Sequence, residues 1–478
     1  MPAFEGPRDA TTRAGPVGSI SRGWPDVCLK SSPAAQAKQR YNLGLVELPQ
    51  SSRRRIGQRR TKGSGVLDTA LASAPESSLA WLDFDRAASE RLSELLRALD
   101  EPGTLDVLGL GTVRDAFSAM LNPGTSTTQT RLRYFIFIPW IFAKLEQEQV
   151  LAAEFSRRLR DYESRLMDCL RHLGRNQGVI GYAAGRNLKR MPSDAYWGGL
   201  RAWGLRRLDL SISEFGQYAA SLARSRPERN DDDEAMTRGV SMWAALPPAP
   251  DDFLHADITF DLAPTEAQVL VEHIRQHHQG SLLAVLCAVP ETAKDAEYPW
   301  ELPTHAMPGQ LVEVLRHARN FSELTAGPQH VYNLLLARRA RTELDWDTDE
   351  LEASQRARLD TWTEQLERRF DEVRSWVADL PAFWALLDNY SVGPRTREFV
   401  NAMAERFVVD PEGFAEDSEV HRRIRDRELR LKSKRARLTH RAALENSNMA
   451  AVGGQFDFRW GIAKSYLNDI ATARAAQN

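Results

Sequence analysis

The sequence predicts a mainly α-helical fold: two packed helical domains, with a disordered basic leader and at most short strands. Apolar residues recur at spacings of three and four in several long segments, helix-capping patterns precede several of these segments, and alternating strand patterns are sparse. The clearest case is 351–380, which places Leu359, Trp362, Leu366, Phe370, Val373 and Trp376 on one helical face.

The composition indicates a globular protein without a dominant overall charge. Hydrophobic residues make up 42% of 478, and the formal net charge is -2, so attraction to nucleic acid must come from local clusters. Cys28, Cys169 and Cys287 lack the spacing of a disulfide framework or a zinc site, which fits a reducing cytoplasm. The longest apolar run, 132–143, is short for a membrane span, which takes about 20 residues. We also find no secretory signal. We therefore expect a cytoplasmic location and no membrane partner.

Residues 1–76 are expected to form a disordered basic leader. Residues 1–65 hold twelve Lys or Arg against four acidic residues and show no sustained apolar period. Two interpretations are open. The arm around Arg53–Lys62 contacts nucleic acid, or the segment is upstream reading frame and translation begins near Val66.

Residues 77–246 are predicted to form the N-terminal helical domain. An amphipathic helix begins at Asp85, and a second follows a capping box of Thr112 and Asp115 and ends at the Asn122-Pro123-Gly124 turn. Ser126 with Gln129 repeats the capping pattern. It favours a helix over 127–137 that stops near Pro139, although 133–138 also suits a buried strand. A charged helix over 145–173 and short helices over 191–225 follow.

Residues 247–478 are predicted to form the C-terminal helical domain. Three prolines within 246–252 mark the boundary. Helices are expected over 265–279, 351–380, 395–407 and 421–441.

The segment 171–207 is the first candidate nucleic-acid surface. It has eight Lys or Arg and one acidic residue, interleaved with aromatic residues. Basic side chains attract phosphates, and aromatic faces stack on bases. The residues we nominate are Arg171, Arg175, Arg186, Lys189, Arg190, Tyr196, Trp197, Arg206 and Arg207. In the alternative, the aromatic residues fill a core and the arginines form a solvated face.

The segment 421–441 is the second candidate. Ten Lys or Arg stand against Asp426 and Glu428, and we nominate Arg430, Lys432, Lys434 and Arg435 as contacts. Such a charge run is also typical of a solvated helix face. The sequence does not distinguish DNA from RNA.

Ser126, Thr127, Arg131 and Arg133 form a candidate anion site, because free N–H groups at a helix start favour an anion. In the alternative, Ser126 only caps the helix and the arginines pair with carboxylates.

The sequence nominates no catalytic residue, no metal ligand and no cofactor. His255, Asp257, Asp261 and Glu266 lie close enough in sequence to bind a cation, but the same pattern describes ordinary turn and capping residues. Neither a GxSxG nor an HExxH motif is present. Enzymatic activity stays open, with a non-enzymatic role favoured.

The phrase GTSTTQTRLRYFIFIPW at 124–140, after WLDF at 81–84, resembles a bacterial family, domain of unknown function 6361. Two later phrases, beginning at Arg319 and at Phe456, also resemble its pattern. The resemblance supplies no catalytic residues. It implies a genomic context of phage defence, beside genes for helicases and phospholipase-D-like nucleases. The expected function is a non-catalytic antiphage component that binds DNA or such a partner. A metal-dependent nuclease and a structural adaptor are the alternatives.

Overall fold

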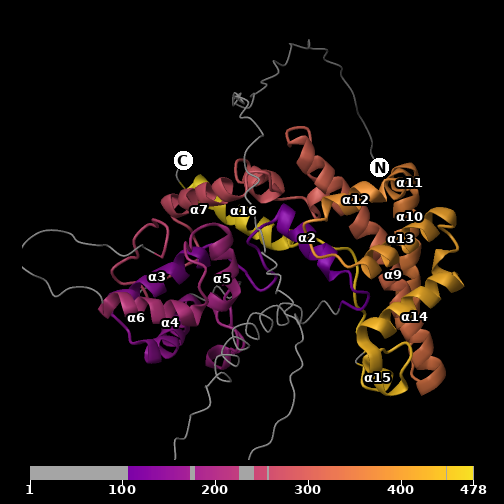
Figure 1. Cartoon of the computed structure of the whole chain (residues 1–478), viewed down its shortest axis with the longest axis horizontal. Coiled ribbons are helices and arrows are strands. Elements are labelled where there is room, and N and C mark those ends of the chain that lie inside the picture. The colour runs from indigo at the N-terminus through magenta and orange to yellow at the C-terminus, as the bar shows by residue number, and fades with distance from the viewer. Residues whose placement is uncertain (1–105, 173–177, 225–241, 256–257, 448, 477–478) are drawn as a thin grey trace, which may run out of the picture. The chain divides into compact units, whose positions relative to one another are not determined.

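A computed structural model describes residues 106–172, 178–224, 242–255, 258–447 and 449–476 (Figure 1). These residues form helices and no named strand, apart from one isolated antiparallel bridge between Arg206 and Trp243, so the predicted mainly α class is confirmed. The leader predicted for 1–76 and the helix predicted from Asp85 lie outside the described residues. None of the described helices is long and apolar enough to span a membrane.

The first group of helices packs around α3 (Figure 1). Its members are α3 (Tyr134–Gln147), α4 (Ala152–His172), the 3₁₀ turn η1 (Gly185–Asn187), α5 (Pro192–Ala202) and α6 (Ile212–Arg224). The run Tyr134–Ile138 is entirely buried because it forms the centre of this group. The helical alternative for this run is therefore confirmed, and the strand alternative is wrong.

The start and end of α3 differ from the prediction. Residues 126–133 form turns, in which Gln129 Oε1 accepts a hydrogen bond from Ser126 N–H at 2.9 Å. The buried Tyr196 hydroxyl accepts from Thr130 N–H and Arg131 N–H, so these donors are satisfied outside a helix. The helix then continues through Pro139 to Gln147 instead of stopping at the proline.

Helix α2 (Gly111–Leu121) lies beside α9 (Figure 1). Its first free N–H groups are satisfied from upstream, because the Asp106 carboxylate accepts hydrogen bonds from Leu110 N–H at 2.8 Å and Gly111 N–H at 2.7 Å. The predicted capping box at Thr112 is therefore wrong, since Thr112 is already inside the helix.

The second group packs around α9, a helix of 36 residues from Gly309 to Leu344 (Figure 1). Its other helices are α10 (Asp349–Glu367), α11 (Phe370–Ala378), α12 (Leu380–Leu386), α13 (Pro394–Val409), η4 (Phe414–Glu416), α14 (Ser418–Lys432), η5 (Ser433–Arg435) and α15 (Arg441–Glu445). The single helix predicted over 351–380 is wrong, because Arg369 leaves helical geometry and its guanidinium bonds Glu323 on α9.

The extended segment 452–456, which we call the strap, is held against α9 by side chains. Asn333 bonds both the N–H and the C=O of Val452, at 3.1 and 2.9 Å. Gln329 does the same for Gly454, at 3.3 and 3.0 Å. Ser322 bonds both groups of Phe456, at 2.8 and 2.9 Å. Polar residues on one face of α9 thus take the place of a neighbouring strand.

Helix α14 is shorter than the helix predicted over 421–441. It ends at Lys432, because Ser433 has a φ of 48° and the chain turns back. The buried Glu428 carboxylate accepts hydrogen bonds from Arg437 N–H, Leu438 N–H and the Tyr332 hydroxyl, which fixes the chain after the turn.

The chain between and after the two groups completes the core. It contains α7 (Pro264–His277), α8 (Leu282–Leu286), η2 (Pro290–Ala293), η3 (Pro299–Glu301) and the last helix, α16 (Trp460–Ala475). Helix α16 packs on α7, α8 and η2 (Figure 1). Asp469 on α16 also bonds Arg131, before α3. The boundary predicted at residue 246 stays a prediction.

Candidate nucleic-acid interface

Six cations surround the C-terminal half of α14, and we call them the α14 cluster. None of their side chains has a hydrogen-bond or ion-pair partner within the described part of the chain. The cluster consists of Arg395 on α13, Arg425 and Arg430 on α14, and Lys432, Lys434 and Arg435 at the turn that follows. All are exposed except Lys432, which is half-buried, and burial lowers the pKa of its ammonium group.

The N-terminal half of α14 is also rich in arginine, but its charges are neutralised. Arg422 pairs with Glu419 at 2.6 Å and with Asp426 at 3.1 Å. Arg423 shares Glu419 at 2.7 Å. Of the ten cations predicted as one set, three pair with carboxylates, two bond only uncharged groups, and five have no partner within the described residues.

Arg427 is buried between α14 and the residues before α2. Its Nε donates to Leu108 O at 2.9 Å, and its Nη2 donates to Gly109 O at 3.2 Å and to the Thr396 hydroxyl at 2.8 Å. Gly109 has a φ of 66°, and a Cβ there would lie 2.6 Å from Arg427 Nη2. Arg427 thus fixes α14 against the start of α2.

In the segment 171–207, the structure separates exposed cations from buried aromatic residues. Lys189 and Arg207 are exposed, Arg190 is half-buried, and none of these side chains has a partner within the described residues. Arg171 is half-buried, lies over the Tyr182 ring and donates to the Tyr182 carbonyl. Arg175 lies outside the described residues, as does the Arg186 side chain.

Tyr196 and Arg206 are buried, and Trp197 is half-buried against the core. Tyr196 is 0% exposed, and burial raises the pKa of its hydroxyl to about 12. Trp197 Nε1 donates to Leu210 O at 2.9 Å, and Arg206 stacks on the Trp197 ring at 4.7 Å. Arg206 itself is 4% exposed. These three side chains pack beneath the surface. For the two aromatic residues, this is the arrangement expected in the alternative in which they fill a core.

The candidate anion site at Ser126 is engaged within the chain. Ser126 and Thr127 lie in turns before α3 and do not begin it. Arg131 bonds Asp469 at 2.7 Å, and Arg133 bonds Glu266 at 2.9 Å. This arrangement matches the alternative in which the arginines pair with carboxylates. Both carboxylates come from distant parts of the sequence.

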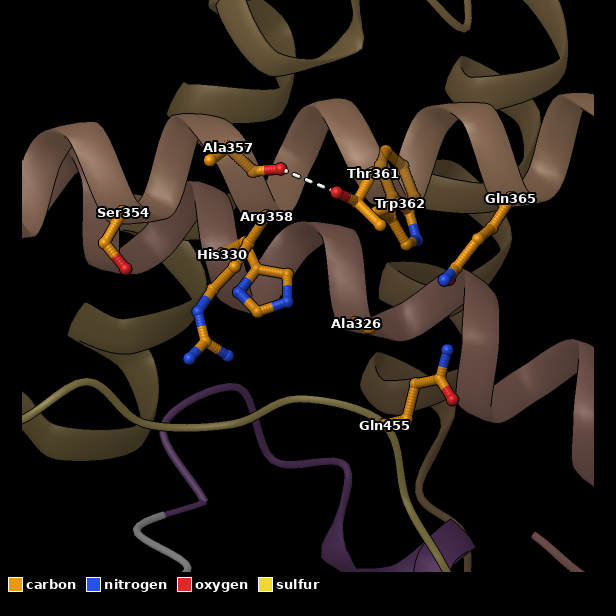
Figure 2. Close-up of a pocket in the computed structure, with 9 residues that line it drawn as sticks. All are labelled: Ala326, His330, Ser354, Ala357, Arg358, Thr361, Trp362, Gln365 and Gln455. Carbon is orange, nitrogen blue, oxygen red and sulfur yellow. Dashed lines mark hydrogen bonds between the residues drawn. The ribbon is translucent and has the colours of Figure 1, made fainter. Parts of the chain in front are cut away.

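A cavity of 370 Å³ lies between α9, α10 and the strap (Figure 2). Arg358 is the one lining residue with a permanent charge, and His330, Gln365 and Gln455 add polar groups. His330 Nδ1 bonds Gln355 at 3.1 Å, and burial lowers the pKa of this imidazole. The cavity is therefore polar but carries little charge.

Among the described residues, no group of three or more His, Cys, Asp or Glu side chains could hold a metal ion. Glu266, considered in sequence with His255, Asp257 and Asp261, pairs with Arg133, and Asp257 lies outside the described residues.

Sequence reasoning did not nominate Arg395, Arg425 or Arg427 individually. Arg395 is distant in sequence from the charge run, so only the packing of α13 on α14 reveals it. Arg425 and Arg427 were counted in the run, but their different burial required the helix to be placed.

The described residues define a mainly helical fold with a group of cations that lack partners within the described part of the chain. The chain belongs to a family of unknown function, domain of unknown function 6361, whose family model matches residues 76–474. Neither the curated proteins nor the solved structures contain a match to this chain.

Proposed function

We propose that this chain is a non-catalytic component of a bacterial antiphage system that binds nucleic acid through the α14 cluster. The observation that carries the proposal is the set of six cations without a partner within the described residues. Cations at a helix C-terminus are stabilised by the helix dipole, but this accounts only for those in the last turn, Arg430 and Lys432. Clustered cations without ion-pair partners are the footprint of phosphate binding.

The defence context rests on the family resemblance. Similar proteins tend to be encoded beside helicase-like and phospholipase-D-like nuclease genes. A nucleic-acid-binding subunit would hold the strand on which such partners act.

The first test is the salt dependence of binding by the full chain. Fluorescence anisotropy with duplex DNA, single-stranded DNA and RNA would be measured between 50 and 200 mM salt. Six neutralised phosphates give a slope of log K against log salt of about -5 for duplex DNA, which is a loss of about 10³ in affinity. A flat titration would contradict the proposal.

The second test assigns the site. The variant R425Q/R430Q/K434Q/R435Q removes four unpaired charges, and we expect the duplex slope to become shallower by about 3 to 4. The matched control R157Q/R368Q/R374Q/R441Q removes four exposed cations that are already paired with carboxylates. Equal loss in both variants would assign binding to overall charge instead of the α14 cluster.

Two further experiments test the other candidates. The variant K189Q/R190Q/R207Q tests the exposed part of the 171–207 segment without disturbing the buried Arg206. Incubation with DNA and Mg²⁺ or Mn²⁺ tests the nuclease alternative, which strand cleavage would support.

A further inference from the structure

A small cavity between α13 and α14 is lined almost entirely by charged groups. Its volume is 170 Å³, and it is lined by five arginines, two acidic residues and Phe399. The arginines are Arg395, Arg422, Arg423, Arg427 and Arg430, and the acidic residues are Glu398 and Asp426. Five positive charges against two negative charges leave a formal excess of three in a space of a few atoms.

Arg427 is the most informative of these residues, because it is only 7% exposed and yet forms no ion pair within the described residues. Its three hydrogen bonds go to two carbonyl oxygens and one hydroxyl, all of them uncharged. Buried charges in proteins are normally paired, since removing an ion from water is costly unless an opposite charge compensates. The carboxylates of Asp106 and Glu398 favour its charge, but neither forms an ion pair with the guanidinium.

Part of the donor capacity of the cavity is free. Nη1 of Arg427 has no hydrogen-bond partner within the described residues, and neither have the side chains of Arg395 and Arg430. Arg422 and Arg423 are held by Glu419, and Asp426 is matched by Arg422. Three guanidinium groups from two helices and the carboxylate of Glu398 are thus left without an ion pair among the described residues, an excess of two positive charges for one ligand.

Resting on the nucleic-acid function proposed above, we infer that this cavity binds a phosphomonoester, the terminal phosphate of a nucleic-acid strand. A phosphomonoester carries about -1.5 to -2 charges at pH 7 and presents three terminal oxygens, which matches three guanidinium groups and an excess of two charges. An internal phosphodiester carries one charge, and its chain continues in both directions, which suits the α14 cluster better than a small cavity.

The position of the cavity fits a strand end. Arg395 and Arg430 line the cavity and also belong to the α14 cluster. A strand with its terminal phosphate in the cavity can therefore place its next phosphates against the rest of the cluster. A free phosphate or mononucleotide offers the same chemistry without the following phosphates.

The test compares single strands of one sequence that carry a 5′-phosphate, a 3′-phosphate or only hydroxyl ends, bound to the full chain at fixed salt. We expect one phosphorylated end to raise the affinity by about ten-fold to hundred-fold, the value of one or two charge-assisted hydrogen bonds. Inorganic phosphate should compete away this preference and leave the binding of the hydroxyl strand unchanged.

The variants separate the cavity from the surrounding surface. Arg395→Gln should abolish the end preference, since Arg395 lines the cavity and is exposed, so that its loss does not threaten the fold. The control Arg435→Gln lies in the α14 cluster outside the cavity, and it should weaken all strands alike and keep the preference. Arg427→Gln is unsuitable as the main variant because Arg427 also holds the start of α2.

Two outcomes would overturn the inference. One is equal affinity for phosphorylated and hydroxyl ends while R425Q/R430Q/K434Q/R435Q still weakens both, which leaves the proposed function standing. The other is binding of inorganic phosphate without any end preference, which would identify free phosphate as the ligand. Absence of salt-dependent binding to any strand would instead be the failure of the proposed function.

Discussion

The carboxylate of Asp469 on the last helix binds the Arg131 guanidinium at 2.7 Å and also accepts the Leu132 N–H at 3.0 Å. Asp469 is 5% exposed and the Arg131 side chain is 26% exposed, so the carboxylate is desolvated and the guanidinium partly so. One buried acidic residue thus neutralises an arginine and caps the chain just before α3.

Asp469→Ala should destabilise the fold by about 3–5 kcal/mol, because it leaves Arg131 charged and uncompensated beside the core. Urea unfolding measures the change. The control Asp371→Ala breaks an exposed pair with Arg374 and should cost less than about 1 kcal/mol. Similar values for the two variants would show that the Asp469 pair is not effectively buried.

The buried carboxyl of Glu163 makes the stability of the fold depend on pH. It is buried, and burial raises the pKa of its carboxyl from 4.5 to about 8, although Ser193 N–H donates to it at 2.6 Å. The folded state therefore holds this proton more tightly than the unfolded state. The contribution of Glu163 to the free energy of unfolding falls as the pH rises from about 4.5 to 8.

Glu163→Gln should remove this loss, because a neutral amide oxygen can still accept from Ser193. At pH 5 the variant and the parent should have similar melting temperatures, and at pH 8.5 the variant should be more stable by at least about 1.4 kcal/mol, the value of one pKa unit. The exposed Glu154→Gln is the control. A difference between variant and parent that stays constant over pH would contradict the argument.

Gly109→Ala should destabilise by about 1–3 kcal/mol, because the left-handed backbone is strained for alanine and the new Cβ meets Arg427. The control Gly309→Ala lies in the first turn of α9, where a Cβ meets nothing within 4 Å, and should be neutral or stabilising by up to about 1 kcal/mol. Thermal unfolding of both variants checks the contrast.

Asn333→Ala tests the strap. The substitution leaves the N–H and the C=O of the buried Val452 without their side-chain partner. We expect the free energy of unfolding to fall by about 2–4 kcal/mol. Amide hydrogen exchange should accelerate first at Val452. The Gln455 side chain has no such bond, so Gln455→Ala should change stability by less than about 0.5 kcal/mol.

Helix type could be predicted from the sequence because burial imposes a period of about 3.6 residues on apolar side chains, as in α7, α10 and α13. Helix ends were harder to predict. The start of α3, the break at Arg369 and the end of α14 are set by bonds to distant side chains, such as Tyr196, Glu323 and Glu428. The sequence around each helix end does not indicate these distant partners.

The candidate site was predicted only as a charge run. Charge counts do not tell Arg422, which is paired, from Arg430, which is unpaired, nor do they reveal that Arg427 is buried. Those differences depend on which face of α14 meets α13, and a mainly cationic helix has too few apolar residues to indicate that face in advance.

Asp469 also has a consequence for biosynthesis. Its partner Arg131 leaves the ribosome 338 residues earlier. Throughout that interval the aromatic core around α3 lacks α16, and a nascent chain in this condition exposes apolar surface that attracts chaperones or other unfinished chains. A stop codon just before α16 would therefore be expected to yield an aggregating product, although it removes only residues 460–478 of the 478 in the sequence.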